Sequence, residues 1–163
     1  MSESSKHLLF RLGRGHYAVP ITQVREIIRR PEITPLPGAP EAIEGLFNLR
    51  GEVYAVVNLR RRFNLRSDED AAAPGCGCEA LVLLLDIGEE NMAALVDGCY
   101  SVEEISEDEV VPAPEDLVLN QEIRAAVYGI VRRGERVLLM VDSYELLPPE
   151  QLARLAELKE VPV

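Results

Sequence analysis

The stretch that decides the fold is Gly45-Leu-Phe-Asn-Leu-Arg-Gly-Glu-Val-Tyr-Ala-Val-Val-Asn58. Two short apolar segments flank Gly51, and glycine tolerates the positive φ that a tight turn requires. The pattern therefore predicts a β-hairpin over 45–58 with its turn at Gly51. Other apolar segments are also short, rich in Val, Ile and Leu, and separated by Gly or Pro. Such a sequence is typical of small, closed β-barrels.

The hairpin is repeated in the C-terminal half, where the same features recur in the same order. The corresponding residues are Gly45 and Gly129, Arg50 and Arg133, Gly51 and Gly134, and Asn58 and Asp142. Upstream of the two hairpins, Val24-Arg-Glu-Ile27 is matched by Val102-Glu-Glu-Ile105. Two related subdomains explain this shared order most simply.

The repeat divides the chain into two spans of similar size. We expect subdomains over 8–66 and 80–148, a connecting loop over 67–79 and a C-terminal helix over 149–163. One small barrel is near the lower size limit for a stable core, so we expect the two to pack together.

Composition excludes several classes of protein. The 163 residues carry a formal net charge of -11, lack Trp and are 5% aromatic, which argues against a nucleic-acid-binding protein. The longest apolar run, Leu81–Leu85, is too short for direct membrane insertion. The N-terminus lacks the apolar core of a signal peptide, so we expect a cytoplasmic protein.

Charge is divided unevenly along the chain. Residues 1–66 hold 11 Lys and Arg against 6 Asp and Glu, whereas 67–163 hold 6 against 22. Opposite patches of this kind steer association between copies or relatives, although a solvated acidic surface that confers solubility explains the asymmetry equally well.

No catalytic or metal-binding constellation emerges. The sequence contains neither a phosphate-binding loop of the Gly-x-x-x-x-Gly-Lys type nor a dinucleotide-binding glycine motif. Cys76, Cys78 and Cys99 lack the paired spacing of zinc ligands, and their role stays open. The acidic residues over 103–109 suggest a solvated loop. We therefore expect no enzyme, no cofactor and no metal.

Several further motifs complete the pattern. They are Leu8-Leu-Phe-Arg-Leu-Gly13, Tyr17-Ala-Val-Pro-Ile21, Thr34-Pro-Leu-Pro-Gly38, Leu95-Val-Asp-Gly98 and Val110-Val-Pro-Ala-Pro114. Together with the hairpin motif and Val24-Arg-Glu-Ile27, they resemble the chemotaxis coupling proteins of the CheW type over about residues 8–148. Asn58 departs from the family, which commonly has Asp there as a charged turn cap.

The resemblance implies a mainly β fold of two intertwined five-stranded SH3-like β-barrels plus a short C-terminal α-helix. It also implies a non-enzymatic adapter that joins the cytoplasmic tip of a chemoreceptor to the regulatory domain of a CheA-type histidine kinase, within membrane receptor arrays. The alternative is an adapter or kinase decoy in a non-flagellar chemosensory system that controls type IV pili or gene expression.

The resemblance carries four residues over as a receptor- and kinase-binding site. Val24 and Glu26 match a family strand at the contact surfaces, and Gly45 and Arg50 match the family hairpin, whose arginine is implicated in receptor coupling. The alternative to partner contact is that Glu26 and Arg50 simply pair with each other on the surface. For three apolar residues of the hairpin, core packing is the favoured role over partner contact. They are Leu46, Phe47 and Leu49.

Overall fold

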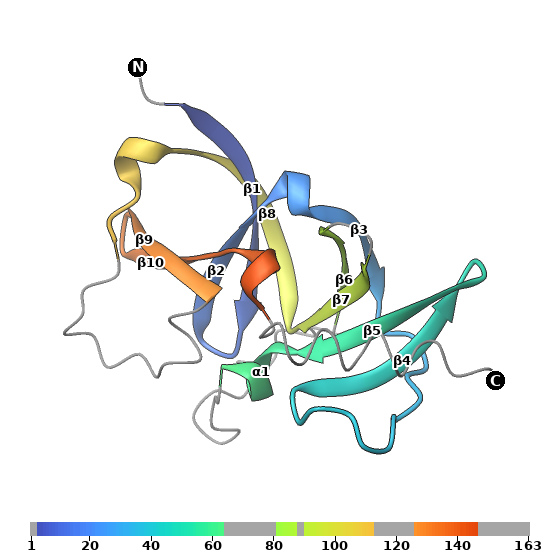
Figure 1. The fold of residues 1–163 in the computed structure, drawn as a ribbon. Helices are drawn as coiled ribbons and strands as arrows, with labels where there is room; N and C mark the ends of the chain where they lie inside the picture. The colour runs from blue at the N-terminus through green and yellow to red at the C-terminus, as the bar shows by residue number, and fades with distance from the viewer. Residues whose placement is uncertain (1–2, 64–80, 88–89, 113–125, 147–163) are drawn as a thin grey trace.

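The computed structural model describes residues 3–63, 81–87, 90–112 and 126–146. Its regular structure is mainly β, arranged as two five-stranded sheets (Figure 1). The strands are β1 (Ser4–Leu12), β2 (Gly15–Pro20), β3 (Val24–Arg29), β4 (Ile43–Leu49), β5 (Glu52–Asn58), β6 (Leu81–Ile87), β7 (Glu90–Val96), β8 (Gly98–Ser106), β9 (Val127–Arg133) and β10 (Arg136–Val141). The helical segments are η1 (Ile21–Gln23), α1 (Leu59–Arg62), η2 (Glu107–Glu109) and η3 (Ser143–Glu145).

The two sheets exchange strands between the halves of the chain. Barrel A has the order β8-β1-β2-β10-β9, and barrel B has the order β3-β6-β7-β5-β4. Strand β3 of the first half pairs with β6 of the second half, and β8 of the second half pairs with β1 of the first. Likewise, β5 pairs with β7 and β10 pairs with β2, so the last hairpin of each half joins the sheet of the other. The predicted pair of intertwined five-stranded barrels is confirmed. Because of this exchange, both 8–66 and 80–148 contribute strands to both barrels.

Both predicted hairpins form, and their surroundings repeat the same backbone contacts. In barrel B, Thr34 and Leu46 exchange hydrogen bonds of 2.8 Å, and Val111 and Ile130 exchange bonds of 2.9 and 2.8 Å in barrel A. The amide of Asn58 donates to the carbonyl of Ala42, as the amide of Asp142 donates to that of Ala126. The sequence repeat is therefore a structural repeat.

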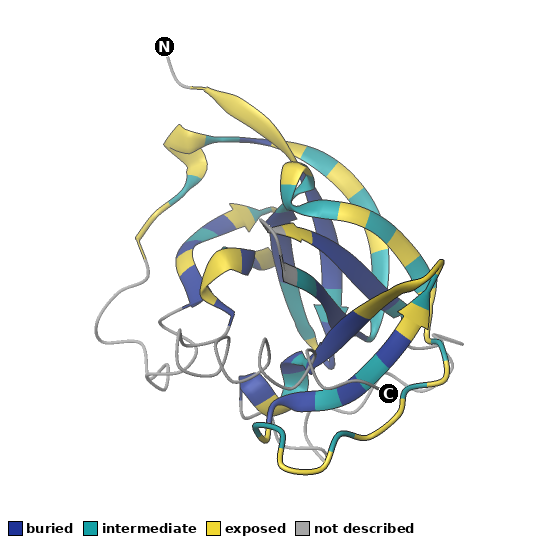
Figure 2. Cartoon of the chain, turned by 45° about the vertical axis from the view of Figure 1, so that its right-hand side comes forward, coloured by how far each residue is buried: buried dark blue, intermediate teal, exposed yellow. Residues whose placement is uncertain are grey.

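The core lies inside each barrel and between the two. One cluster fills barrel A around Leu9 and Met140, and another fills barrel B around Phe47 and Val82. The third and largest cluster lies where the barrels meet and includes side chains from both. Since β5 lies between the core of barrel B and this shared cluster, its central residues are buried on both faces (Figure 2). The two barrels thus share one continuous apolar interface.

Polar contacts also join the barrels. Asp97, between β7 and β8, accepts hydrogen bonds from the amide of Gly13 in the β1–β2 turn and from the guanidinium of Arg60 on α1. Gln23 accepts a 2.8 Å bond from the amide of Ser143. The Asp97 contacts connect the β1–β2 turn to α1, and the Gln23 contact connects η1 to η3.

Two details of the sequence interpretation change. Glu103 and Glu104 lie in strand β8 rather than in a solvated loop, because β8 pairs with β1 over nearly its full length. Asn58 still caps a helix, since its side-chain oxygen accepts the amide of Arg61 at the start of α1. The predicted loop over 67–79 and helix over 149–163 lie outside the described residues.

Candidate partner-binding site

The β4–β5 hairpin ends in a two-residue turn that fixes the direction of one arginine. Arg50 and Gly51 have φ values of 53° and 84°, and positive φ at both central residues is the pattern of a type I′ turn. The side-chain oxygen of Asn48 accepts a 3.1 Å hydrogen bond from the amide of Gly51, which stabilises the turn. Arg50 therefore projects from a rigid tip, with 70% of its side chain exposed.

The partner of Arg50 within the chain is Glu26 on β3. Nη1 and Nη2 of Arg50 donate to the two carboxylate oxygens of Glu26 at 3.0 and 2.9 Å. The hydrogen bonds from Arg50 lower the pKa of Glu26, and the same contact raises the pKa of Arg50. Both groups stay charged at neutral pH, and the exposed guanidinium remains accessible from solvent.

The structure brings two of the four predicted site residues together. Glu26 and Arg50 form the ion pair, whereas Val24 is partly buried against the core between the barrels. Gly45 approaches the backbone of Thr34 so closely that a side chain would overlap its carbonyl oxygen. The roles of Val24 and Gly45 within the chain are therefore packing roles that hold β3 and β4 in place.

The apolar residues of the hairpin pack as expected. Phe47 is buried inside barrel B and stacks on Tyr54 with ring centroids 5.4 Å apart. Leu49 packs against the same cluster, and Leu46 packs against the core between the barrels. Their function is to support the hairpin from within.

Strand β3 carries further exposed residues beside Glu26 that the sequence interpretation left out of the site. Ile27 is 42% exposed, as are several other large apolar side chains of the described residues. Arg25 bonds the hydroxyl of Tyr54 at 3.2 Å and pairs with Asp86 at 3.4 Å. Burial alternates along β3, so Arg25 and Ile27 are exposed, whereas Glu26 is half-buried like Val24. Ile27 therefore lies on the opposite face of β3 from Glu26.

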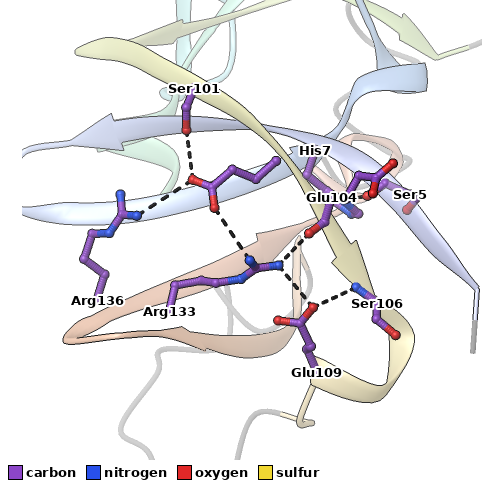
Figure 3. Close-up of polar contacts among 9 residues, drawn as sticks. Ser5, His7, Ser101, Glu104, Ser106, Glu109, Arg133 and Arg136 are labelled. Carbon is purple, nitrogen blue, oxygen red and sulfur yellow. Dashed lines mark hydrogen bonds and ion pairs between the residues drawn. The ribbon is translucent and has the colours of Figure 1, made fainter.

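Barrel A contains the counterpart of the Arg50 pair in a more enclosed form. Arg133, at the end of β9, lies between Glu103 on β8 and Glu109 on η2, at 3.7 and 3.1 Å (Figure 3). It also donates to the backbone carbonyl of Glu104. Its side chain is only 27% exposed, against 70% for Arg50. The hairpin arginine of barrel B is therefore the one that is accessible to a partner.

Reactive groups in the described part of the chain are few. Within 3–63, 81–87, 90–112 and 126–146, His, Cys, Asp and Glu side chains form no group of three or more that could hold a metal ion. Burial raises the pKa of Cys99 to about 11, so its thiol stays protonated at neutral pH. Cys76 and Cys78 lie outside the described residues. In the same ranges, the helices are too short to cross a membrane.

Comparison with known proteins gives a consistent result. The family model described as "CheW-like domain" matches residues 6–151. The chain is 30% identical over 158 residues to chemotaxis protein CheW of Treponema pallidum, covering 96% of this chain and 89% of the relative. It is 31% identical over 151 residues to chemotaxis protein CheW of Klebsiella aerogenes, covering 90% and 83%. The crystal structure of scaffolding protein TtCheW from Thermoanaerobacter tengcongensis aligns with a TM-score of 0.74 at 26% identity, covering 88% of this chain and 92% of the other.

Proposed function

The chain belongs to the CheW-like domain family, and from this membership we propose that it is a chemotaxis adapter that couples transmembrane chemoreceptors to a CheA-type histidine kinase. The observation that carries the proposal is the extent of the match. The family model spans 6–151, and relatives named for chemotaxis align over nearly their whole length. The adapter works by binding and is not an enzyme. It lies in the cytoplasm and joins receptor arrays through its partners.

The proposal assigns the exposed hairpin tip and β3 of barrel B to partner contact. Arg50 offers a planar guanidinium with a fixed direction, which binds a carboxylate through two parallel hydrogen bonds. Glu26 binds it in this way within the chain, so an acidic group of a partner takes the same geometry by displacing Glu26. The cytoplasmic tip of a receptor and the regulatory domain of the kinase are the two partners we assign to this part of the molecule.

A capture experiment tests the function. The chain is immobilised as wild type, Arg50→Glu and Arg14→Glu, and bacterial lysate is passed over each. Arg14 is an exposed arginine in the β1–β2 turn of barrel A, so it controls for the change in charge. We expect the wild type and Arg14→Glu to retain a histidine kinase and a chemoreceptor, and Arg50→Glu to retain less receptor. Failure of the folded wild type to retain either protein would overturn the adapter role.

A further inference from the structure

Barrel A has an open pocket at one end that the adapter role leaves unexplained. Its volume is about 370 Å³, within the range of small-ligand sites. In the β-sheet register, Ser5 pairs with Ile105 and His7 pairs with Pro20, which places these four residues on one face. The residues that line the pocket are Ser5, His7, Pro20, Ile105, Glu107, Val110 and Tyr128. Because Ile105 also belongs to the inner cluster of barrel A, the pocket is the mouth of that barrel.

His7 presents a hydrogen-bond acceptor in this pocket. The residue is only 4% exposed, and its Nδ1 lies 3.0 Å from the carbonyl oxygen of Ser5. A carbonyl only accepts, so Nδ1 carries the proton and Nε2 carries a lone pair. Burial lowers the pKa of His7, which keeps the ring neutral at pH 7.

The Nε2 atom of His7 has no hydrogen-bond partner among the described residues. In that part of the chain, the Nε of Arg133 is the one fully buried side-chain nitrogen or oxygen without a partner. Nε2 of His7 is therefore not sealed from solvent, and the pocket is the space that it borders.

Glu107 also lines the pocket, and a polar network holds its 3-10 helix in place. Ser106 caps η2 by accepting the amide of Asp108 and by donating its own amide to Glu109 (Figure 3). Arg133 pairs with Glu109 at 3.1 Å, which anchors η2 to the β9–β10 hairpin. The backbone of Glu107 bonds to Glu3 and Val110, whereas its carboxylate has no ion pair or hydrogen bond to another described residue.

The nearby cations are already engaged. Arg133 and Arg136 both pair with Glu103, on the β8 face next to the pocket, and neither lines the pocket. The wall therefore offers an imidazole acceptor, a carboxylate and apolar carbon from Pro20, Ile105 and Val110. Among the described residues of the wall, an anion would meet no positive charge, whereas a cationic donor with an aliphatic stem suits the carboxylate, the imidazole and the apolar carbon.

We propose that the mouth of barrel A binds a primary alkylammonium group, either a free amine or the side chain of a lysine. Two of its N–H groups are donated to Nε2 of His7 and to the carboxylate of Glu107. The aliphatic stem packs on Pro20, Ile105 and Val110. The pocket is thus a second binding site, on barrel A, while the Arg50 hairpin belongs to barrel B.

The two histidines of the chain make the test direct. The sequence contains only His7 and His16. His16 is occupied, because its Nδ1 lies 2.9 Å from the hydroxyl of Tyr100, so it serves as an internal control. The full chain, labelled with ¹⁵N, is titrated at about pH 7.5 with n-butylammonium chloride, and with n-butanol as the uncharged analogue. We expect a saturable shift of the His7 Nε2 resonance with the ammonium, little shift with the alcohol, and no shift at His16.

Matched variants identify the carboxylate. Glu107→Gln should weaken binding by about tenfold, in line with the loss of a charged hydrogen bond, whereas Asp108→Asn on the same 3-10 helix should leave it unchanged. Tighter binding of Nα-acetyl-lysine N-methylamide than of n-butylammonium would identify a protein lysine as the ligand, and equal or weaker binding would identify a free amine. Absence of a saturable His7 shift with both ammonium probes, or equal affinity in Glu107→Gln, would overturn the proposal.

Discussion

Arg50 at the tip of the β4–β5 hairpin donates two parallel hydrogen bonds to Glu26 on β3, at 3.0 and 2.9 Å. The pair joins β3 and β4, the two edge strands of barrel B. Arg133 makes the corresponding connection in barrel A, between the β9–β10 hairpin and β8. A hairpin arginine therefore links the edge strands of each barrel, and Arg50 is much more exposed than Arg133.

The first prediction separates partner contact from internal pairing. The double variant Glu26→Arg, Arg50→Glu keeps an ion pair at the same place with its direction reversed. Because the pair is exposed, we expect little change in the free energy of unfolding. If Arg50 contacts a carboxylate of the partner directly, partner affinity falls by about tenfold or more, as it does for Arg50→Glu alone. Two quantities are measured for each variant: its affinity for the captured kinase and receptor, and its free energy of unfolding by urea denaturation.

The opposite outcome is equally clear. Recovery of wild-type affinity in the double variant, after its loss in both single variants, would show that the pair acts by holding the hairpin to β3. The control is Arg14→Glu, which changes the net charge by the same amount as Arg50→Glu at a distant turn.

Local chemistry explains why the hairpins and the repeat were predictable. A turn at Gly51 or Gly134 depends on residues next to it in the chain, and both glycines have positive φ. The exchange of strands between barrels depends on which strand pairs with which across the whole chain, and no short motif encodes that choice. The pocket at His7 illustrates the same limit, because its wall combines residues from position 5 to position 128.

The site was predictable to a similar degree. The family motif identified Glu26 and Arg50, and the sheet places them in contact. It did not identify Ile27, whose exposure depends on the position of β3 at the edge of barrel B. The acidic residues Glu103 and Glu109 looked like solvated charges, since their partner Arg133 follows much later in the chain.

The second prediction compares two equivalent glycines. Gly45→Ala would drive a methyl group into the backbone carbonyl of Thr34, which is fixed by paired hydrogen bonds to Leu46. Gly129→Ala would meet Cγ1 of Val110 at 2.5 Å, where the valine side chain can shift, and the carbonyl oxygen of Val111 at 3.1 Å, a much smaller overlap than at Thr34. We expect Gly45→Ala to cost about 3 kcal/mol and Gly129→Ala about 1 kcal/mol in free energy of unfolding. Urea denaturation checks the order, and an equal or reversed order would contradict it.

The third prediction concerns the contact between the barrels at Asp97. Asp97→Ala removes the acceptor for the amide of Gly13 and for Arg60, both of which are partly buried. Hydrogen bonds to charged groups are worth about 1.5–3 kcal/mol, so we expect a loss of about 2 kcal/mol in the free energy of unfolding. Asp86→Ala is the matched control, since Asp86 makes one exposed ion pair and should change little. A neutral Asp97→Ala variant would show that the apolar interface alone holds the barrels together.

The fourth prediction is a dependence of stability on pH that comes from the two histidines. Burial lowers the pKa of both His7 and His16 in the folded chain. As the pH falls, the unfolded chain therefore binds a proton at each histidine near the ordinary pKa of 6.5, before the folded chain does. Stability is full above this value and falls as the pH decreases through it toward the folded pKa.

The ionisable groups that lie near His7 are Glu103 on β8, Glu107 on η2 and Tyr128 on β9. Burial raises the pKa of Tyr128, so its hydroxyl stays protonated over the pH range of this measurement. Glu26 and Glu44 have pKa values below 4.5, so their contribution to stability is lost only at more acidic pH.

Urea denaturation between about pH 5.5 and 7.5 isolates the contribution of the histidines to stability. His7→Gln should be less stable than the wild type at the upper pH and show a shallower pH dependence, with the remaining slope due to His16. A wild type whose stability is flat over this range, or an unchanged slope in His7→Gln, would contradict the burial of His7 as a neutral imidazole.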